Sequence, residues 1–82
     1  MIDYNEVYSK VRAMLCEAKD LEIESISEDM PLSQLKLDSL DYVELMLLAN
    51  KEFSVTIETE VFVDQPGLTL RELCKFISEK GE

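Results

Sequence analysis

The chain has 82 residues, of which 46% are hydrophobic and 32% are charged, and its formal net charge at pH 7 is −10. This length predicts a single domain over residues 1–82, and the hydrophobic content excludes an intrinsically disordered chain. The excess of carboxylates argues against nucleic acid as a partner and favours proteins that present a basic patch. No apolar run approaches the length of a membrane span, and the first residues lack the basic region of a secretory signal, so we expect a cytoplasmic monomer.

The first part of the chain has the spacing of an amphipathic helix, which we predict from Asp3 to Lys19. Asp3 is expected to cap this helix, with Glu6 completing a capping box. The apolar stripe consists of Tyr4, Val7, Tyr8, Val11, Met14, Leu15 and Ala18.

The helical pattern then stops, and residues 20–37 are expected to form one long loop. The segment Leu21–Glu24 alternates like a strand, but no other segment offers a convincing partner for it. Leu32 and Leu35 are expected to anchor the loop to the core. A loop of this length in a small domain is commonly functional or held down by its own side chains.

A second helix is predicted to begin at Asp38 or Ser39 and to end near Phe53. Asp38 is a good N-cap residue, and Asp41 three positions later gives a weak form of the capping box. The helix carries more apolar residues than one buried face can hold. One face holds Leu45, Leu48, Ala49 and Phe53, and a second face holds Leu40, Val43, Glu44 and Leu47.

Ser39 has a hydroxyl at the start of this helix, but nothing nearby could activate it as a nucleophile. The chain has no histidine, and no Gly-x-Ser-x-Gly sequence surrounds the serine. A helix N-terminus instead favours a bound anion, because its free N–H groups and dipole point there. The carboxylates do not follow EF-hand spacing, so we expect no metal site.

After Phe53, the sequence predicts a connecting segment and then a short helix at Glu58–Val63. A turn at Asp64–Gly67 is predicted to lead into the last helix. Thr69 is expected to cap the last helix in a box with Glu72. Its buried stripe is Leu70, Leu73, Cys74 and Ile77, with Phe76 beside it, and Gly81 suits its C-terminus. Two cysteines, Cys16 and Cys74, are expected to be reduced and partly buried.

These elements predict an all-α fold, a small four-helix bundle with three longer helices, one short helix and a long first loop. The segment Leu37–Leu45 reads Leu-Asp-Ser-Leu-Asp-Tyr-Val-Glu-Leu and resembles the signature of acyl carrier proteins. The loop 26–35 resembles the family's first loop, and Ile57 matches the aliphatic residue that plugs its core. Lys36 stands where the family usually has glycine, so the loop could enter the helix differently.

The resemblance implies a carrier that catalyses nothing. A phosphopantetheinyl transferase would attach 4′-phosphopantetheine from coenzyme A to Ser39, and the arm's thiol would hold acyl groups as thioesters. Partners would be that transferase, an acyl-ACP synthetase or acyltransferase, and a ketosynthase of fatty acid or polyketide biosynthesis, each docking through a basic patch. The contact residues implied are Asp38, Leu40, Asp41, Val43, Glu44 and Leu47.

Two alternatives remain open at this point. The chain could be a carrier of a dedicated pathway, such as a polyketide, aminoacyl, peptidyl or D-alanyl carrier, although the aspartates on both sides of Ser39-Leu40 resemble acyl rather than peptidyl carriers. It could also be an unmodified protein-interaction module that uses only its acidic face.

Overall fold

The computed structural model describes residues 2–65 and 67–81, and it is helical as predicted. Four α-helices are separated by loops, and within the described residues the only strand-like pairing is an isolated bridge between Pro31 and Thr69. The helices are α1 (Tyr4–Lys19), α2 (Ser39–Phe53), α3 (Thr59–Val63) and α4 (Leu70–Lys80), and two short 3₁₀ helices, η1 (Ile23–Ser25) and η2 (Leu32–Leu35), lie in the first long loop. The predicted fold class, three longer helices with one short helix, is confirmed.

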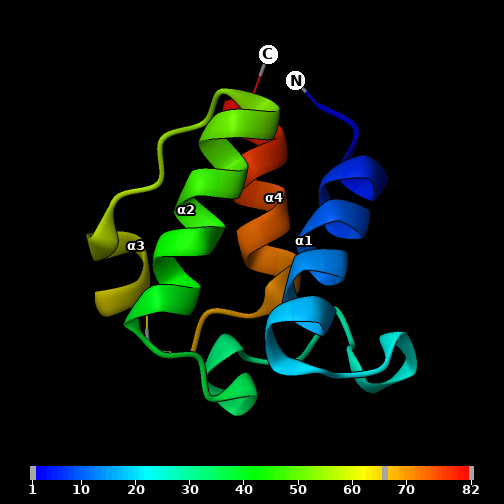
Figure 1. Ribbon diagram of the computed structural model, residues 1–82. Helices are drawn as coiled ribbons and strands as arrows, with labels where there is room; N and C mark the ends of the chain where they lie inside the picture. The colour runs from blue at the N-terminus through cyan, green and yellow to red at the C-terminus, as the bar shows by residue number, and fades with distance from the viewer. Residues whose placement is uncertain (1, 66, 82) are drawn as a thin grey trace.

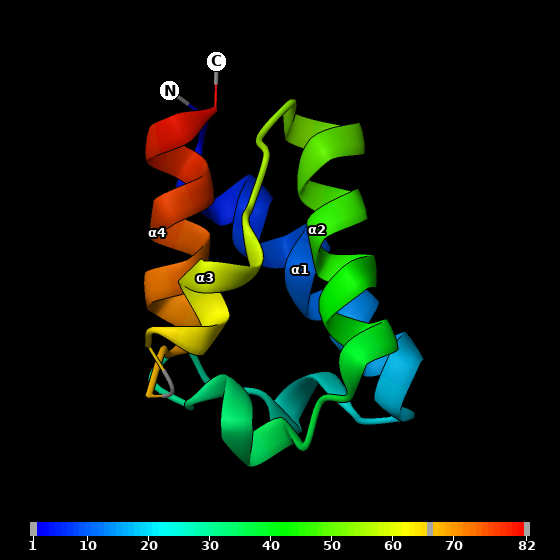
Figure 2. The same ribbon diagram turned by 90° about the vertical axis from the view of Figure 1, so that its left-hand side faces the viewer.

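The three long helices pack around a common interior, and α3 lies between α2 and α4 on one side of the molecule (Figures 1 and 2). Both chain ends lie at one end of the bundle. The long loop after α1 crosses the opposite end and leads into the N-terminus of α2 (Figure 1). This arrangement places the first turn of α2 beside the last turn of α1.

The core is aliphatic and draws on every long helix. Its members from the helices are Val7, Val11 and Leu15 of α1, Leu45, Ala49 and Phe53 of α2, and Leu70, Leu73, Cys74 and Ile77 of α4. Ile57, in the segment between α2 and α3, is also buried, as its predicted role as a plug requires. Burial of these side chains is the main favourable term that holds the helices together.

The long loop is fixed by buried side chains and by main-chain hydrogen bonds. Leu32 and Leu35 are buried, which confirms their predicted role as anchors. The Leu32 N–H donates to the Leu68 carbonyl at 2.9 Å, and the Leu70 N–H donates to the Met30 carbonyl at 2.9 Å. The segment Leu21–Glu24, which alternates like a strand, instead leads into η1 at Ile23, and the part of the chain that the structure describes has no strand that could pair with it.

A polar cluster joins α1, the loop and α4. The Tyr4 hydroxyl donates to Glu28 Oε2 at 2.7 Å, and the Arg71 guanidinium lies 2.7 Å from Asp29 Oδ1 and 3.5 Å from Glu28 Oε2. Burial and the Glu28 carboxylate both raise the pKa of Tyr4, so its hydroxyl remains a donor at neutral pH. These contacts hold the loop against α1 and α4.

The helix ends follow the predicted capping residues with two differences. Thr69 and Glu72 form the predicted capping box, but Asp3 accepts from the Asn5 N–H at 3.3 Å rather than forming a box with Glu6. Gly81 caps α4 in an extended conformation instead of a left-handed one.

Gly81 leaves space for Ile2, because a Cβ at Gly81 would require the Ile2 side chain to move. Ile2 lies against α4 through two hydrogen bonds with Ser78. The Ile2 N–H donates to the Ser78 carbonyl at 3.0 Å, and the Ser78 hydroxyl donates to the Ile2 carbonyl. These contacts pin the start of the chain to the end of α4.

The short helix α3 depends on tertiary contacts, as its β-branched residues predict. The Phe62 ring packs on the Tyr42 ring of α2, with 4.7 Å between their centroids. The turn predicted after α3 includes residue 66, which lies outside the described residues, while the Leu68 N–H donates to the Gln65 carbonyl at 2.9 Å.

Both cysteines are free thiols, as predicted. Cys16 is partly buried, as predicted, whereas Cys74 is completely buried and so is less exposed than predicted. Burial raises the pKa of Cys74 to about 12, so this thiol stays protonated at neutral pH.

None of the described helices has the length and apolar character required to cross a membrane.

Candidate functional site

The N-terminus of α2 is built by a complete capping box. The Asp41 N–H donates to Asp38 Oδ1 at 2.9 Å, and the Asp38 N–H donates to Asp41 Oδ2 at 3.1 Å. Aspartate therefore serves at the third helical position where glutamate is more usual. Because Asp38 is the cap, Ser39 is the first helical residue and its exposed hydroxyl is not used for capping.

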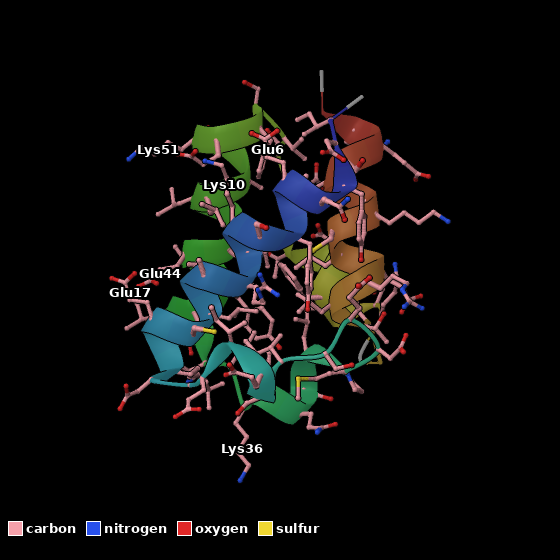
Figure 3. The ribbon with its side chains drawn as sticks, turned by 90° about the vertical axis from the view of Figure 1, so that its right-hand side faces the viewer. Glu6, Lys10, Glu17, Lys36, Glu44 and Lys51 are labelled. Carbon is pink, nitrogen blue, oxygen red and sulfur yellow. The ribbon has the colours of Figure 1, made fainter. Side chains whose placement is uncertain are left out.

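The loop reaches this helix through a residue in a conformation that favours glycine. Lys36 has φ 56° and ψ 47°, in the left-handed region. A lysine adopts this conformation at some cost relative to glycine. Lys36 therefore adopts the left-handed conformation that favours glycine, and a different path of the loop into the helix stays a prediction. Its side chain projects away from the helices (Figure 3).

The exposed face of α2 gathers most of the predicted contact residues. Leu40 is 72% exposed, Val43 45% and Leu47 62%, although all three are apolar. Asp38 and Glu44 are exposed on the same helix, and Glu44 projects outward from the bundle (Figure 3). We call Asp38, Leu40, Val43, Glu44 and Leu47 the α2 surface. It combines an apolar strip with negative charge, a combination common in protein contact surfaces.

Asp41 differs from the other predicted contact residues because the structure turns it inward. It is only 8% exposed, and its Oδ2 lies 2.7 Å from the Lys19 ammonium at the end of α1. The hydrogen bond from Lys19, followed by that from the Asp38 N–H, lowers the pKa of Asp41, and the same pair raises the pKa of Lys19. The Asp41 carboxylate is therefore engaged within the fold, and its direct contact with partners stays a prediction.

A groove between α2 and α3 begins at Ser39. Its volume is about 340 Å³, and its lining residues are Ser39, Tyr42, Val43, Met46, Thr59, Phe62 and Val63. The sequence pattern did not assign the α3 residues to a site, because nothing in α3 indicates that it packs beside Ser39. The aromatic pair Tyr42 and Phe62 is the contact that brings them together.

Within the described residues, no three potential metal ligands come together. The chemistry available at this end of the bundle is that of an exposed hydroxyl, a helix N-terminus and an apolar groove.

Comparisons with known proteins agree with this geometry. A family model described as a phosphopantetheine attachment site matches residues 9–77. The acyl carrier protein of a Picosynechococcus species is 32% identical over 76 residues, which cover 92% of this chain and 91% of that protein. The chain belongs to the phosphopantetheine-binding family of acyl carrier proteins.

A second relative is a much larger protein. A non-reducing polyketide synthase of Preussia isomera is 34% identical over 74 residues, which cover 90% of this carrier but only 3% of the synthase. Family membership makes the chain a non-catalytic carrier with a covalently attached 4′-phosphopantetheine group, and carriers of this family work with biosynthetic enzymes.

The first turn of α2 fits such a group. The N–H groups of Ser39 and Leu40 are the first two of the helix, and no carbonyl within the helix can accept from them. A phosphodiester on the Ser39 hydroxyl would lie near these donors and the positive end of the helix dipole. Lys19 compensates the charge of Asp41, so one of the two carboxylates nearest this position is already paired.

Proposed function

We propose that Ser39 carries the phosphopantetheine arm of this carrier. The observation that carries this proposal is that Ser39 is an exposed serine at the first position of a 15-residue helix, with its hydroxyl left free by the Asp38 cap. The arm supplies a terminal thiol that holds acyl groups as thioesters. The chain's own part is to present the hydroxyl, to place N–H donors beside the phosphate and to offer a surface that partners recognise.

We further propose that the α2 surface is the docking site for those partners. Its exposed leucines supply apolar area, while Asp38 and Glu44 attract Arg and Lys side chains. Partners of this kind would be a phosphopantetheinyl transferase, an acyltransferase or acyl-ACP synthetase, and a ketosynthase. We propose that the chain delivers acyl groups in fatty acid or polyketide biosynthesis. The names of the two relatives, an acyl carrier protein and a polyketide synthase, support an acyl cargo and are compatible with polyketide biosynthesis.

The direct experiment uses the purified chain with coenzyme A, Mg²⁺ and a broad-specificity transferase. Intact-mass measurement should show one added arm on the wild-type chain and none on Ser39→Ala. Ser33→Ala, which removes another exposed serine in η2, is the matched control and should be modified normally. Acyl loading should then add further mass that hydroxylamine removes, as expected of a thioester.

Failure of the wild-type chain to gain an arm with several such transferases would refute the carrier proposal. The chain would then act as an unmodified interaction module that uses its acidic face. Modification of the Ser39→Ala variant would place the arm on a different residue.

A further inference from the structure

Two ion pairs join α1 to α2, and they differ in their surroundings. Lys10, in the middle of α1, lies 2.8 Å from Glu52 near the C-terminal end of α2, and Lys19, the last residue of α1, lies 2.7 Å from Asp41 in the first turn of α2. The Lys10 and Glu52 side chains are 41% and 31% exposed, whereas those of Lys19 and Asp41 are 23% and 11% exposed. Exposed ion pairs contribute little to stability, because water and salt screen them. The Lys19–Asp41 pair is less exposed and is therefore the one that can hold its two side chains in a defined geometry.

The Lys19 pair is also connected to the main chain around Ser39. Asp41 Oδ2, the atom nearest the Lys19 ammonium, also accepts the Asp38 N–H at 3.1 Å. The Asp41 N–H in turn binds the Asp38 carboxylate. Ser39 and Leu40 lie between these two linked residues. Asp41 Oδ2 therefore connects the end of α1 to the backbone N–H of Asp38, directly before Ser39, and Asp38 Oδ1 closes the box on the other side of Ser39.

Lys19 is the last residue of α1, and Asp41 belongs to the first turn of α2, so their contact joins the two ends of the long loop. Without the ammonium, the Asp41 carboxylate would remain mostly buried and without its charged partner, a costly arrangement. It would gain hydration by turning outward, and it would then release the Asp38 N–H. The expected result is a looser first turn of α2 at Ser39.

We propose that Lys19 is a positioning residue for Ser39: through Asp41 it fixes the first turn of α2 in the geometry that a phosphopantetheinyl transferase requires. This inference rests on the proposed attachment of the arm at Ser39. Lys19 forms its ion pair with Asp41 and none with Asp38 or Glu44 of the α2 surface, although the Asp38 carboxylate is near enough to attract it. Its removal should therefore affect the rate of transfer rather than the recognition of the chain by the transferase.

The test compares Lys19→Met with Lys10→Met, which breaks the other α1–α2 ion pair with the same chemical change. Lys19→Arg is the conservative variant that should restore function. Hydrogen exchange of the Asp38 and Asp41 amides in the unmodified chain reports on the first turn without any transferase. Steady-state kinetics then measure kcat and KM separately for transfer of the phosphopantetheine arm from coenzyme A. These measurements are made well below the unfolding temperature of each variant.

In Lys19→Met, both amides should exchange faster and kcat should fall roughly five- to ten-fold, since misplacement of a reacting group by less than 1 Å is enough for such a loss. The KM should stay the same or decrease, because the α2 surface is intact and the local charge is more negative. Lys10→Met should leave both amides and kcat unchanged. Lys19→Arg should bring both readouts close to wild type.

Several outcomes would overturn the inference. It fails if the Asp38 and Asp41 amides in Lys19→Met are as protected from exchange as in wild type. It fails too if these amides exchange faster in Lys19→Met but its kcat equals that of wild type. It also fails if Lys10→Met lowers kcat equally, since the loss would then reflect general destabilisation. A wild-type chain that gains no arm overturns this inference and the proposed function together, whereas normal modification of both wild type and Lys19→Met overturns the inference alone.

Discussion

The two faces of α2 contain similar apolar residues in opposite environments. On one face Leu45, Ala49 and Phe53 are at most 4% exposed, and on the other Leu40 and Leu47 are more than half exposed. From helical periodicity alone, the apolar residues of either face could be assigned to a buried core. The difference teaches that a helix can have more apolar residues than its core covers. We propose that in this carrier the uncovered residues serve contact with other proteins.

The largest expected effect is a difference between the two faces of α2 in how much a substitution lowers the free energy of unfolding. Leu45→Ala should lower the free energy of unfolding by about 2–5 kcal/mol, since it leaves a cavity in the core. Leu47→Ala, the same change on the exposed face, should stay within about 0.5 kcal/mol of wild type. Denaturant unfolding followed by circular dichroism measures both. Equal losses would mean that the exposed face is covered by the fold, and the comparison would fail.

The second effect concerns recognition of the exposed face of α2 by a transferase. Leu47→Ala should reduce kcat/KM for transfer of the arm about five-fold, because a central apolar contact is lost from the α2 surface. Ile23→Ala, which truncates an exposed apolar residue in η1, is the matched control and should have no effect. Similar rates for wild type and Leu47→Ala with every partner enzyme tested would remove Leu47 from the docking site.

A smaller effect concerns charge on the exposed face. Glu44→Lys should slow association with a transferase at low ionic strength, and the difference from wild type should shrink as salt is added. Glu79→Lys makes the same charge change at an exposed position of α4 and should have a weaker effect. If the two reversals are equivalent at all salt concentrations, net charge rather than the α2 surface steers the partner.

The smallest effect concerns Asp41, the charged residue on the buried face of α2. Its pKa is lower in the folded chain than its usual value of 3.8, so the folded state favours the carboxylate. The wild-type chain should therefore be more stable than Asp41→Asn above this pH, and the advantage should be lost as pH falls through the lower folded pKa. Thermal unfolding of both chains between neutral and acidic pH measures this. An advantage that persists unchanged into strong acid would contradict the Lys19–Asp41 pairing.

The helices and their caps could be predicted from sequence because they depend on local spacing. The first helix was expected from Asp3 to Lys19 and runs from Tyr4 to Lys19, and the Thr69 box formed as predicted. The exposed strip on α2 followed from an excess of apolar residues combined with the family resemblance.

Other features depend on contacts between distant segments, and no local pattern reports them. Asp41 looks like one more surface carboxylate until α1 places Lys19 beside it. The groove beside Ser39 exists because Phe62 of α3 packs on Tyr42. The sequence predicts only a loop at η1, because its residues alternate in polarity like a strand for which no partner segment is evident, and this pattern gives no sign of a 3₁₀ helix.

The most direct test of the central claim is to locate the arm by tandem mass spectrometry on peptides from the modified wild-type chain. The carrier account predicts that the phosphopantetheine mass lies on the peptide that contains Ser39 and that fragment ions assign it to that residue. An arm found on any other serine, or no arm on a chain that a transferase has been shown to bind, would contradict it.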